Sequence, residues 1–229
     1  MSRGTVTPGR RAARLRPGWA TGAGVAATAA LVLLGPATAV SGPFRIDPER
    51  TRLAVRTHRD GLGSGLAHDH VVEATEVTGR VEYDANRPDA SSVTVEARTA
   101  SLRADEPAAR RRLGVEGDLS ESQRADVSKA MRAADQLDVA RHPTIRFAST
   151  RVVAEGDGRL RITGSLTLRG VTREVSFPAT VALEGGVLRG RATLTFLQSS
   201  FGYQPYSALL GAIRNKDEVS LHVDLVAIP

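Results

Sequence analysis

The chain has 229 residues, no cysteine, 4% aromatic residues, and 31 Lys and Arg against 25 Asp and Glu. The absence of cysteine excludes a disulfide framework, a thiolate metal site and a cysteine nucleophile. The length is that of one domain or at most two, and single β-barrels often reach it.

The N-terminal segment has the organisation of a secretory signal peptide. Five arginines precede an apolar run over residues 19–34, which is followed by Gly35-Pro36 and by the small residues 37–39. A basic region, a short apolar region and an A-x-A-like site predict cleavage after Ala39. An uncleaved membrane anchor is the alternative, but glycines interrupt the run and it is shorter than the ~20 apolar residues of a spanning helix. We therefore expect residues 1–39 to direct export to the periplasm, the outside of the cell or the outer face of the cytoplasmic membrane. The arginines of this segment are Arg3, Arg10, Arg11, Arg14 and Arg16.

The leader also accounts for the positive net charge. Residues 1–39 contain five arginines and no acidic residue, so the rest of the chain has 26 basic residues against 25 acidic ones. A nearly neutral chain without basic runs interleaved with aromatic residues is not typical of a nucleic-acid-binding protein. We therefore expect no nucleic-acid partner.

Alternation of apolar and polar residues dominates the chain from Phe44 onward. Between residues 159 and 169, for example, leucine and isoleucine alternate with arginine and threonine, and Gly170 then turns the chain. This period of two is typical of strands with one buried face, and turn residues between the strands indicate hairpins. About eight such strands predict an all-β fold, a closed antiparallel barrel. The remaining predicted strands are Phe44–Thr57, Ala67–Tyr83, Ser91–Leu102, Thr144–Val153, Thr172–Leu183, Val187–Leu197 and Asp217–Ala227.

Two segments interrupt the strand pattern. Within the charged stretch Ala104–Ala140, Ser120 and Gln123 have the spacing of a capping box, which predicts a helix from about Ser120 to Ala134. The apolar segment Tyr206–Ile213 predicts a short late helix before the last strand. Each of the two either covers a mouth of the barrel or is a surface connection without a role in binding.

His68 and His70 are the most suggestive polar pair. Two imidazoles two residues apart on a strand project from one face and can share a metal, but a zinc site needs a third or fourth ligand that the sequence does not supply. If the strand bulges near residues 73–76, the two histidines face the interior, and without a bulge they face solvent.

Motifs for catalysis are not found. The chain has no G-x-S-x-G and no P-loop, and the carboxylate pairs Asp105-Glu106 and Asp217-Glu218 are expected to be solvated surface groups. We therefore expect a binding protein and not an enzyme.

Several segments resemble one bacterial family. Residues 136–147 (QLDVARHPTIRF) are similar to the "fLDv.k.P.i.F" signature of the YceI-like family, and residues 164–172 (GSLTLRGVT) are similar to its "G.LTlrGvT" hairpin. Phe44–Pro48 fits the first strand of the family, and Phe201-Gly202 with residues 216–219 resembles its late "fG … kDeV" segment. The resemblance covers residues 44–229 in the right order.

The resemblance implies an extended lipocalin-like barrel that holds an amphiphilic lipid, such as a polyisoprenoid or an isoprenoid quinone, and that works close to a membrane. It calls for no other cofactor. Two alternatives remain: a metal- or haem-linked redox accessory protein that uses His68 and His70, and a protein-interaction module whose barrel is filled by Phe147, Phe177 and Phe196. The residues expected to contact a ligand are Ile145, Phe147, Ile162, Leu166, Val175, Phe177, Val181, Leu194, Phe196, Leu221 and Val223, with His68 and His70 at an entrance.

Overall fold

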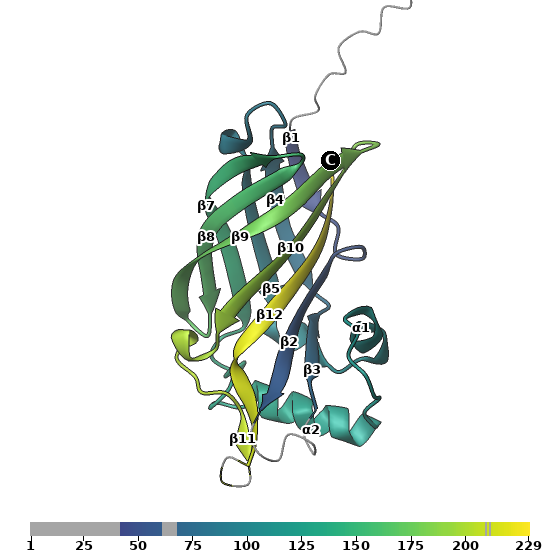
Figure 1. Ribbon diagram of the computed structural model, residues 1–229, viewed down its shortest axis with the longest axis vertical. Coiled ribbons are helices and arrows are strands. Elements are labelled where there is room, and N and C mark those ends of the chain that lie inside the picture. The colour runs from purple at the N-terminus through teal and green to yellow at the C-terminus, as the bar shows by residue number, and fades with distance from the viewer. Residues whose placement is uncertain (1–41, 61–67, 209, 211) are drawn as a thin grey trace, which may run out of the picture. The chain divides into compact units, whose positions relative to one another are not determined.

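The computed structural model describes residues 42–60, 68–208, 210 and 212–229. The predicted leader, residues 1–39, lies outside this range. The described residues form one antiparallel sheet of 12 strands (Figure 1). The strands are β1 (Gly42–Ile46), β2 (Arg52–Asp60), β3 (His70–Ala74), β4 (Val77–Tyr83), β5 (Ser92–Arg98), β6 (Leu102–Ala104), β7 (Thr144–Gly156), β8 (Arg159–Leu168), β9 (Val171–Glu184), β10 (Val187–Leu197), β11 (Ser207–Ala208) and β12 (Ile213–Ile228).

Eight of these strands close into a barrel. Their order is β1-β4-β5-β7-β8-β9-β10-β12, and β12 pairs with β1 to complete the ring. The closing register joins Arg45 to Ile228 and Ile46 to Ala227. The predicted antiparallel barrel of about eight strands is therefore confirmed, and closure satisfies the edges that an open sheet would expose.

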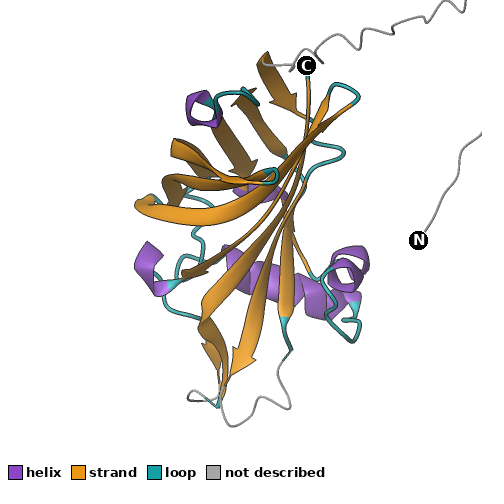
Figure 2. Cartoon of the chain, turned by 45° about the horizontal axis from the view of Figure 1, so that its top comes forward, coloured by secondary structure: helices purple, strands orange, loops and turns teal. Residues whose placement is uncertain are grey.

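Three predicted strands each form two strands in the structure, namely β1 and β2, β3 and β4, and β5 and β6. Of these, β2, β3 and β6 are not part of the closed ring. They extend the sheet from β12 in the order β2-β3-β6. Figure 2 shows the strands of the sheet in orange and the helices in purple. Between β1 and β2 the side chain of Asp47 accepts the backbone N–H groups of Glu49 and Arg50, a local turn that competes with strand pairing. The prediction of continuous strands over residues 44–57, 67–83 and 91–102 is wrong at these breaks.

The break between β3 and β4 changes which residues face the interior. Ala74 at the end of β3 and Val77 at the start of β4 are both buried, although they have opposite parity. Residues 75 and 76 lie between the two strands, where the sequence suggested a bulge. His70, which has the parity of Ala74, consequently belongs to the inward set.

The helices follow the charged stretch of the sequence. The structure contains α1 (Pro107–Arg112) and α2 (Glu121–Arg132), and the capping box of Ser120 and Gln123 is present. The helix predicted from about Ser120 to Ala134 is thus confirmed. It packs on β6 and lies near the end of the barrel where β11 is found (Figure 1). Within the described residues, no helix is long and apolar enough to cross a lipid bilayer.

The late segment 206–213 differs from its prediction. Ser207 and Ala208 pair with Arg214 and Ile213, so the two ends of the segment form a hairpin instead of a helix. Of the residues between these ends, the structure describes Leu210, which lies in a 3-10 turn, and Ala212. The strand pairing satisfies backbone groups that a short isolated helix would leave free.

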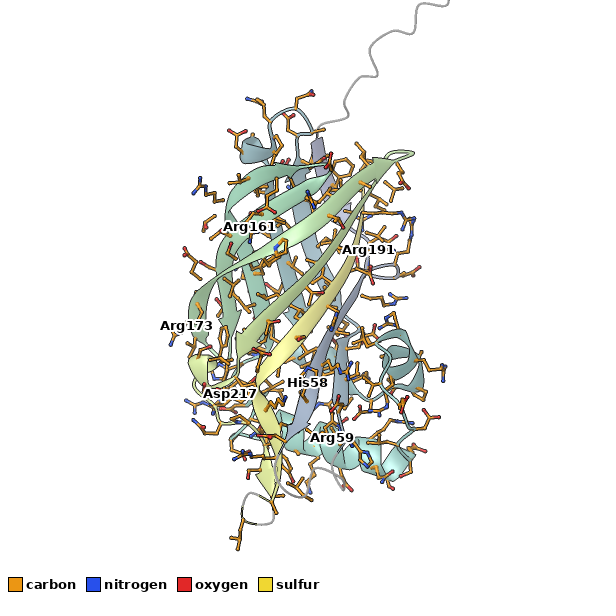
Figure 3. All side chains as sticks on the ribbon, viewed as in Figure 1. His58, Arg59, Arg161, Arg173, Arg191 and Asp217 are labelled. Atoms are coloured by element: carbon orange, nitrogen blue, oxygen red, sulfur yellow. The ribbon has the colours of Figure 1, made fainter. Side chains whose placement is uncertain are left out.

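The predicted faces of the barrel wall are confirmed. On β8, Leu160, Leu166 and Leu168 are buried, whereas the intervening Arg161 is exposed. Arg161 lies on the outer side of the wall (Figure 3). Alternate side chains of a strand point to opposite faces, so a closed sheet with this pattern has an apolar interior.

Candidate ligand-binding cavity

The barrel interior contains two adjoining chambers. The inner chamber has a volume of about 160 Å³ and the outer chamber about 330 Å³. The outer value falls in the range of roughly 300–1,000 Å³ that is usual for small-molecule sites. The two chambers adjoin because the same side chains line both. These are Leu53, Ala97, Ile145, Leu166 and Leu221.

Apolar side chains of the closed ring surround the inner chamber. Phe147 and Phe177 meet at 5.6 Å between ring centroids, with a tilt of 54° between the rings. Phe177 and Val181 are only half-buried although they point inward, because their remaining accessible surface faces the chamber. The aromatic rings therefore form a wall and do not fill the lumen, which contradicts the alternative of a filled barrel.

The outer chamber lies between the barrel end and α2. Val127, Ala130 and Met131 of α2 face it, so the helix forms part of the cavity wall and is not only a surface connection. The inner chamber has polar residues mainly at its far end, whereas polar residues form a larger part of the lining of the outer chamber. The polar residues of the outer chamber are Thr57, His70, Asp126, Gln136, Gln198, Tyr203, Tyr206 and Asn215.

Most side chains predicted to contact a ligand line a chamber. The inner chamber is lined by Ile145, Phe147, Ile162, Leu166, Phe177, Val181, Leu194, Leu221 and Val223, and the outer chamber by Ile145, Leu166, Phe196, Leu221 and His70.

Val175 and His68 line neither chamber, and their predicted place in the lining is corrected. Val175 packs against the buried cluster that contains Leu166 and Leu168. His68 is exposed, because it precedes the first residue of β3 and strand alternation therefore does not turn it inward.

Asp105 holds His70 in place from behind the cavity wall. The Nδ1 atom of His70 lies 2.7 Å from Oδ2 of Asp105, and the backbone N–H of Val71 donates to Oδ1 at 2.9 Å. Asp105 is 0% exposed, so its assignment as a solvated surface carboxylate was wrong. The residue adopts φ of 54°, a conformation that aspartate tolerates better than most residues.

Arg110 compensates the buried charge of Asp105. Its Nη1 donates to Asp105 Oδ1 at 2.7 Å and to the carbonyl of Asp69 at 2.8 Å. Its Nε donates to the carbonyl of Gly117 and its Nη2 to the carbonyl of Glu116, so each of the three guanidinium nitrogens donates at least one hydrogen bond. Burial alone would raise the pKa of Asp105, but the contacts from His70, Val71 and Arg110 outweigh burial, and the net direction is downward.

The sequence offered no signal for this network. Arg110 lies in an arginine-rich turn that looks like a solvated surface, and its pairing with Asp105 depends on how α1 packs against β3. Val127 and Met131 are four residues apart and therefore share one face of α2, but this spacing does not show which space that face borders.

The structure does not bring the two histidines into a common donor set. His68 is exposed, and Nδ1 of His70 is bonded to Asp105. Within the part of the chain that the structure describes, His, Cys, Asp and Glu side chains form no group of three or more with the geometry of a metal site.

The fold and the cavity define the class of this protein, a closed antiparallel β-barrel with an apolar interior. Residues 44–227 match the model of the YceI-like domain, and the chain belongs to the YceI-like family.

Similar proteins come from several bacteria. A UPF0312 protein of Pseudomonas putida is 32% identical over 153 residues, which cover 67% of this chain and 69% of that protein. A UPF0312 protein of Azotobacter vinelandii is 33% identical over the same length. Among solved structures, BcnA of Burkholderia cenocepacia aligns with a TM-score of 0.61 at 19% identity, covering 79% of this chain and 98% of BcnA. The YCEI protein of Campylobacter jejuni aligns with a TM-score of 0.51 at 12% identity, covering 68% and 82%. These structures share the fold.

Proposed function

We propose that this protein is a binding protein for an amphiphilic lipid with a long apolar tail of the isoprenoid type. The observation that carries the proposal is the pair of adjoining chambers with an apolar wall. An apolar chain gains about 25 cal/mol for each Å² removed from water, so a lined tunnel binds it with few polar contacts. The tail occupies the inner chamber and the polar end of the lipid lies in the outer chamber.

The proposed setting is outside the cytoplasm and close to a membrane. The basic and apolar leader in residues 1–39 supports export. A lipid of this type has low solubility in water, so a protein that buffers or carries it works beside the bilayer that contains it. The protein then acts as a carrier, a reservoir or a sensor for the lipid.

Native mass spectrometry tests the proposal directly. Protein purified without detergent is expected to carry a bound amphiphile of several hundred daltons, or to take up one equivalent of added geranylgeraniol. Protein that is empty after purification and that takes up no prenyl lipid would contradict the proposal.

Two neighbouring residues on β10 provide a matched pair of variants. Leu194 is buried and lines the inner chamber, whereas Thr195 is exposed on the outer face. Leu194→Trp fills part of the chamber and is expected to lower the affinity for the lipid at least tenfold, while Thr195→Trp leaves the affinity unchanged. Circular dichroism of both variants establishes that the barrel is folded. Equal affinities of the two folded variants would place the ligand outside the inner chamber.

A further inference from the structure

Most polar groups of the cavity face the outer chamber, which His70 also lines. These groups indicate which polar end the bound lipid carries, an inference that rests on the proposed function. The inner chamber is bordered by apolar side chains along the ring strands, whereas hydroxyl, amide and imidazole groups face the outer chamber. The polar end of an amphiphile is therefore most stable in the outer chamber, where its groups find partners.

The hydrogen bonds of His70 fix its available atom. Asp105 is ionised, since its pKa lies below the ordinary value, and a carboxylate only accepts hydrogen bonds. Nδ1 of His70 must therefore donate the 2.7 Å bond. In the neutral ring the proton is then on Nδ1, and Nε2 is an acceptor. Among the described residues, the ring of His70 is hydrogen-bonded through Nδ1 only.

The charges around the outer chamber disfavour an anionic head group. Phosphate sites normally use Arg or Lys side chains or the N-terminus of a helix. The lining described for this chamber contains neither Arg nor Lys, and the α2 residues in it, 126–131, lie beyond the first turn of the helix. Arg110 is committed to Asp105 and to three carbonyl groups. Asp126, an exposed residue that lines the chamber, adds negative charge.

Neutral donors and acceptors complete the outer chamber. Tyr203 is buried there, and burial raises the pKa of its phenol, so the group stays protonated. Gln198 is buried as well and donates its amide to the carbonyl of Lys216. These groups suit an uncharged polar end and offer no countercharge to a phosphate.

We propose that the outer chamber selects an uncharged, hydroxyl-bearing head group, such as that of an isoprenoid alcohol, whose O–H donates a hydrogen bond to Nε2 of His70. Asp105 and Arg110 are positioning residues, because they hold the imidazole from behind and do not touch the ligand. The site disfavours phosphorylated forms of the same lipid, because no Arg or Lys side chain is found in the described lining. Arg169 lies 5.9 Å from the Tyr203 ring, but its guanidinium donates to the carbonyls of Gly202 and Ala134.

A competition among three lipids with the same tail tests this selectivity. Geranylgeraniol, its methyl ether and geranylgeranyl diphosphate are mixed in equal amounts with the full chain, and native mass spectrometry gives the ratio of bound forms. The alcohol is expected to exceed the ether by about tenfold, the order of one buried hydrogen bond, and to exceed the diphosphate by more. Diphosphate bound as well as the alcohol, or ether bound as well as the alcohol, would overturn the proposal.

Two variants of His70 assign the preference to one atom. His70→Asn retains a donor close to the position of Nδ1, and so keeps the bond to Asp105, but has no atom at Nε2. It is expected to bind the alcohol and the ether equally while remaining folded. His70→Gln brings an amide oxygen near the position of Nε2 and is expected to recover part of the preference. Folded His70→Asn that still prefers the alcohol tenfold would contradict the assignment.

The outcomes separate the two proposals. If none of the three lipids binds, the proposed function fails and the selectivity fails with it. If the lipids bind with another order of preference, the tail site stands and only the head-group assignment is wrong.

Discussion

Asp105 and Arg110 form a 2.7 Å ion pair in which the side chains are 0% and 1% exposed. Such a pair is costly to break from one side, because the remaining charge stays buried without a partner. The pair also fixes the loop after α1, through the carbonyls of Glu116 and Gly117.

Asp105→Asn is therefore expected to lower the free energy of unfolding by about 3–5 kcal/mol. Asparagine has nearly the same shape and tolerates the positive φ of this position, so the loss reports the charge together with the one acceptor oxygen that the amide group lacks. Urea unfolding followed by circular dichroism measures it. The control is Glu155→Gln, which breaks the exposed 2.6 Å pair with Arg161 and is expected to cost less than about 1 kcal/mol. Equal losses in the two variants would contradict the importance of burial.

The same carboxylate predicts a dependence of stability on acid pH. The pKa of Asp105 is lower in the folded protein than its ordinary value of 3.8, so the unfolded chain takes up a proton first as the pH falls. The contribution of Asp105 is fully present above the unfolded pKa and is lost as the pH drops through the folded pKa. Urea midpoints measured from about pH 7 downward are therefore expected to converge for the wild type and Asp105→Asn below pH 3.8. A difference that does not change with pH would show that Asp105 does not titrate in this range.

Gly164 on β8 allows Phe147 to lie flat against the barrel wall. A Cβ at position 164 would stand 2.4 Å from the carbonyl oxygen of Ala148 and 2.6 Å from Cζ of Phe147. Gly164→Ala is expected to destabilise the barrel by about 1–3 kcal/mol and to push the ring into the inner chamber, which lowers lipid affinity. Thermal unfolding and lipid titration measure the two effects.

Gly190 provides the matched control for that change. It lies on β10 and also lines the inner chamber, but a Cβ there would approach only Leu225, at 3.8 Å. Gly190→Ala is expected to fold with nearly unchanged stability. If both alanine variants behave alike, crowding at Phe147 is not the cause.

The capping box of α2 stabilises the part of the cavity wall that the helix provides. Ser120 accepts the N–H of Gln123, and the side chain of Gln123 accepts the N–H of Ser120. Ser120→Ala is expected to cost about 0.5–2 kcal/mol, chiefly in α2. Hydrogen exchange is expected to be faster in residues 121–132 than in the wild type, with little change in the barrel strands. Ser128→Ala, inside the same helix, is the control, since alanine is a better helix former than serine.

The strand pattern of the second half of the chain was predictable because it depends on local information. On β8 and β10, and on β9 from Val175 onward, the inward and outward residues alternate without interruption, and short turns at Gly170 and Gly185 fix each register. A closed sheet with one apolar face then requires an apolar interior. The capping box of α2 was equally local, since its two partners are three residues apart.

The first half of the chain was less predictable. The strand breaks at residues 47–51 and 75–76 reverse the parity of the inward face. The sequence suggested a bulge near the second break, but the first break was not predicted. The late segment 206–213 is apolar enough for a helix, but pairing with the start of β12 satisfies its backbone. The strand breaks and the late hairpin both depend on which strand pairs with the segment in the folded protein.

The sequence by itself therefore determined the family, the barrel and the apolar character of its interior, because these follow from periodicity and local motifs. Only the tertiary structure decided that the interior is hollow, since a cavity depends on how distant side chains pack. Only the tertiary structure placed His70 at the outer chamber and His68 outside, because the choice depends on where β3 begins. It also made Asp105 a buried partner of Arg110, because a charged pair leaves solvent only where the packing of α1 against β3 removes water from both groups.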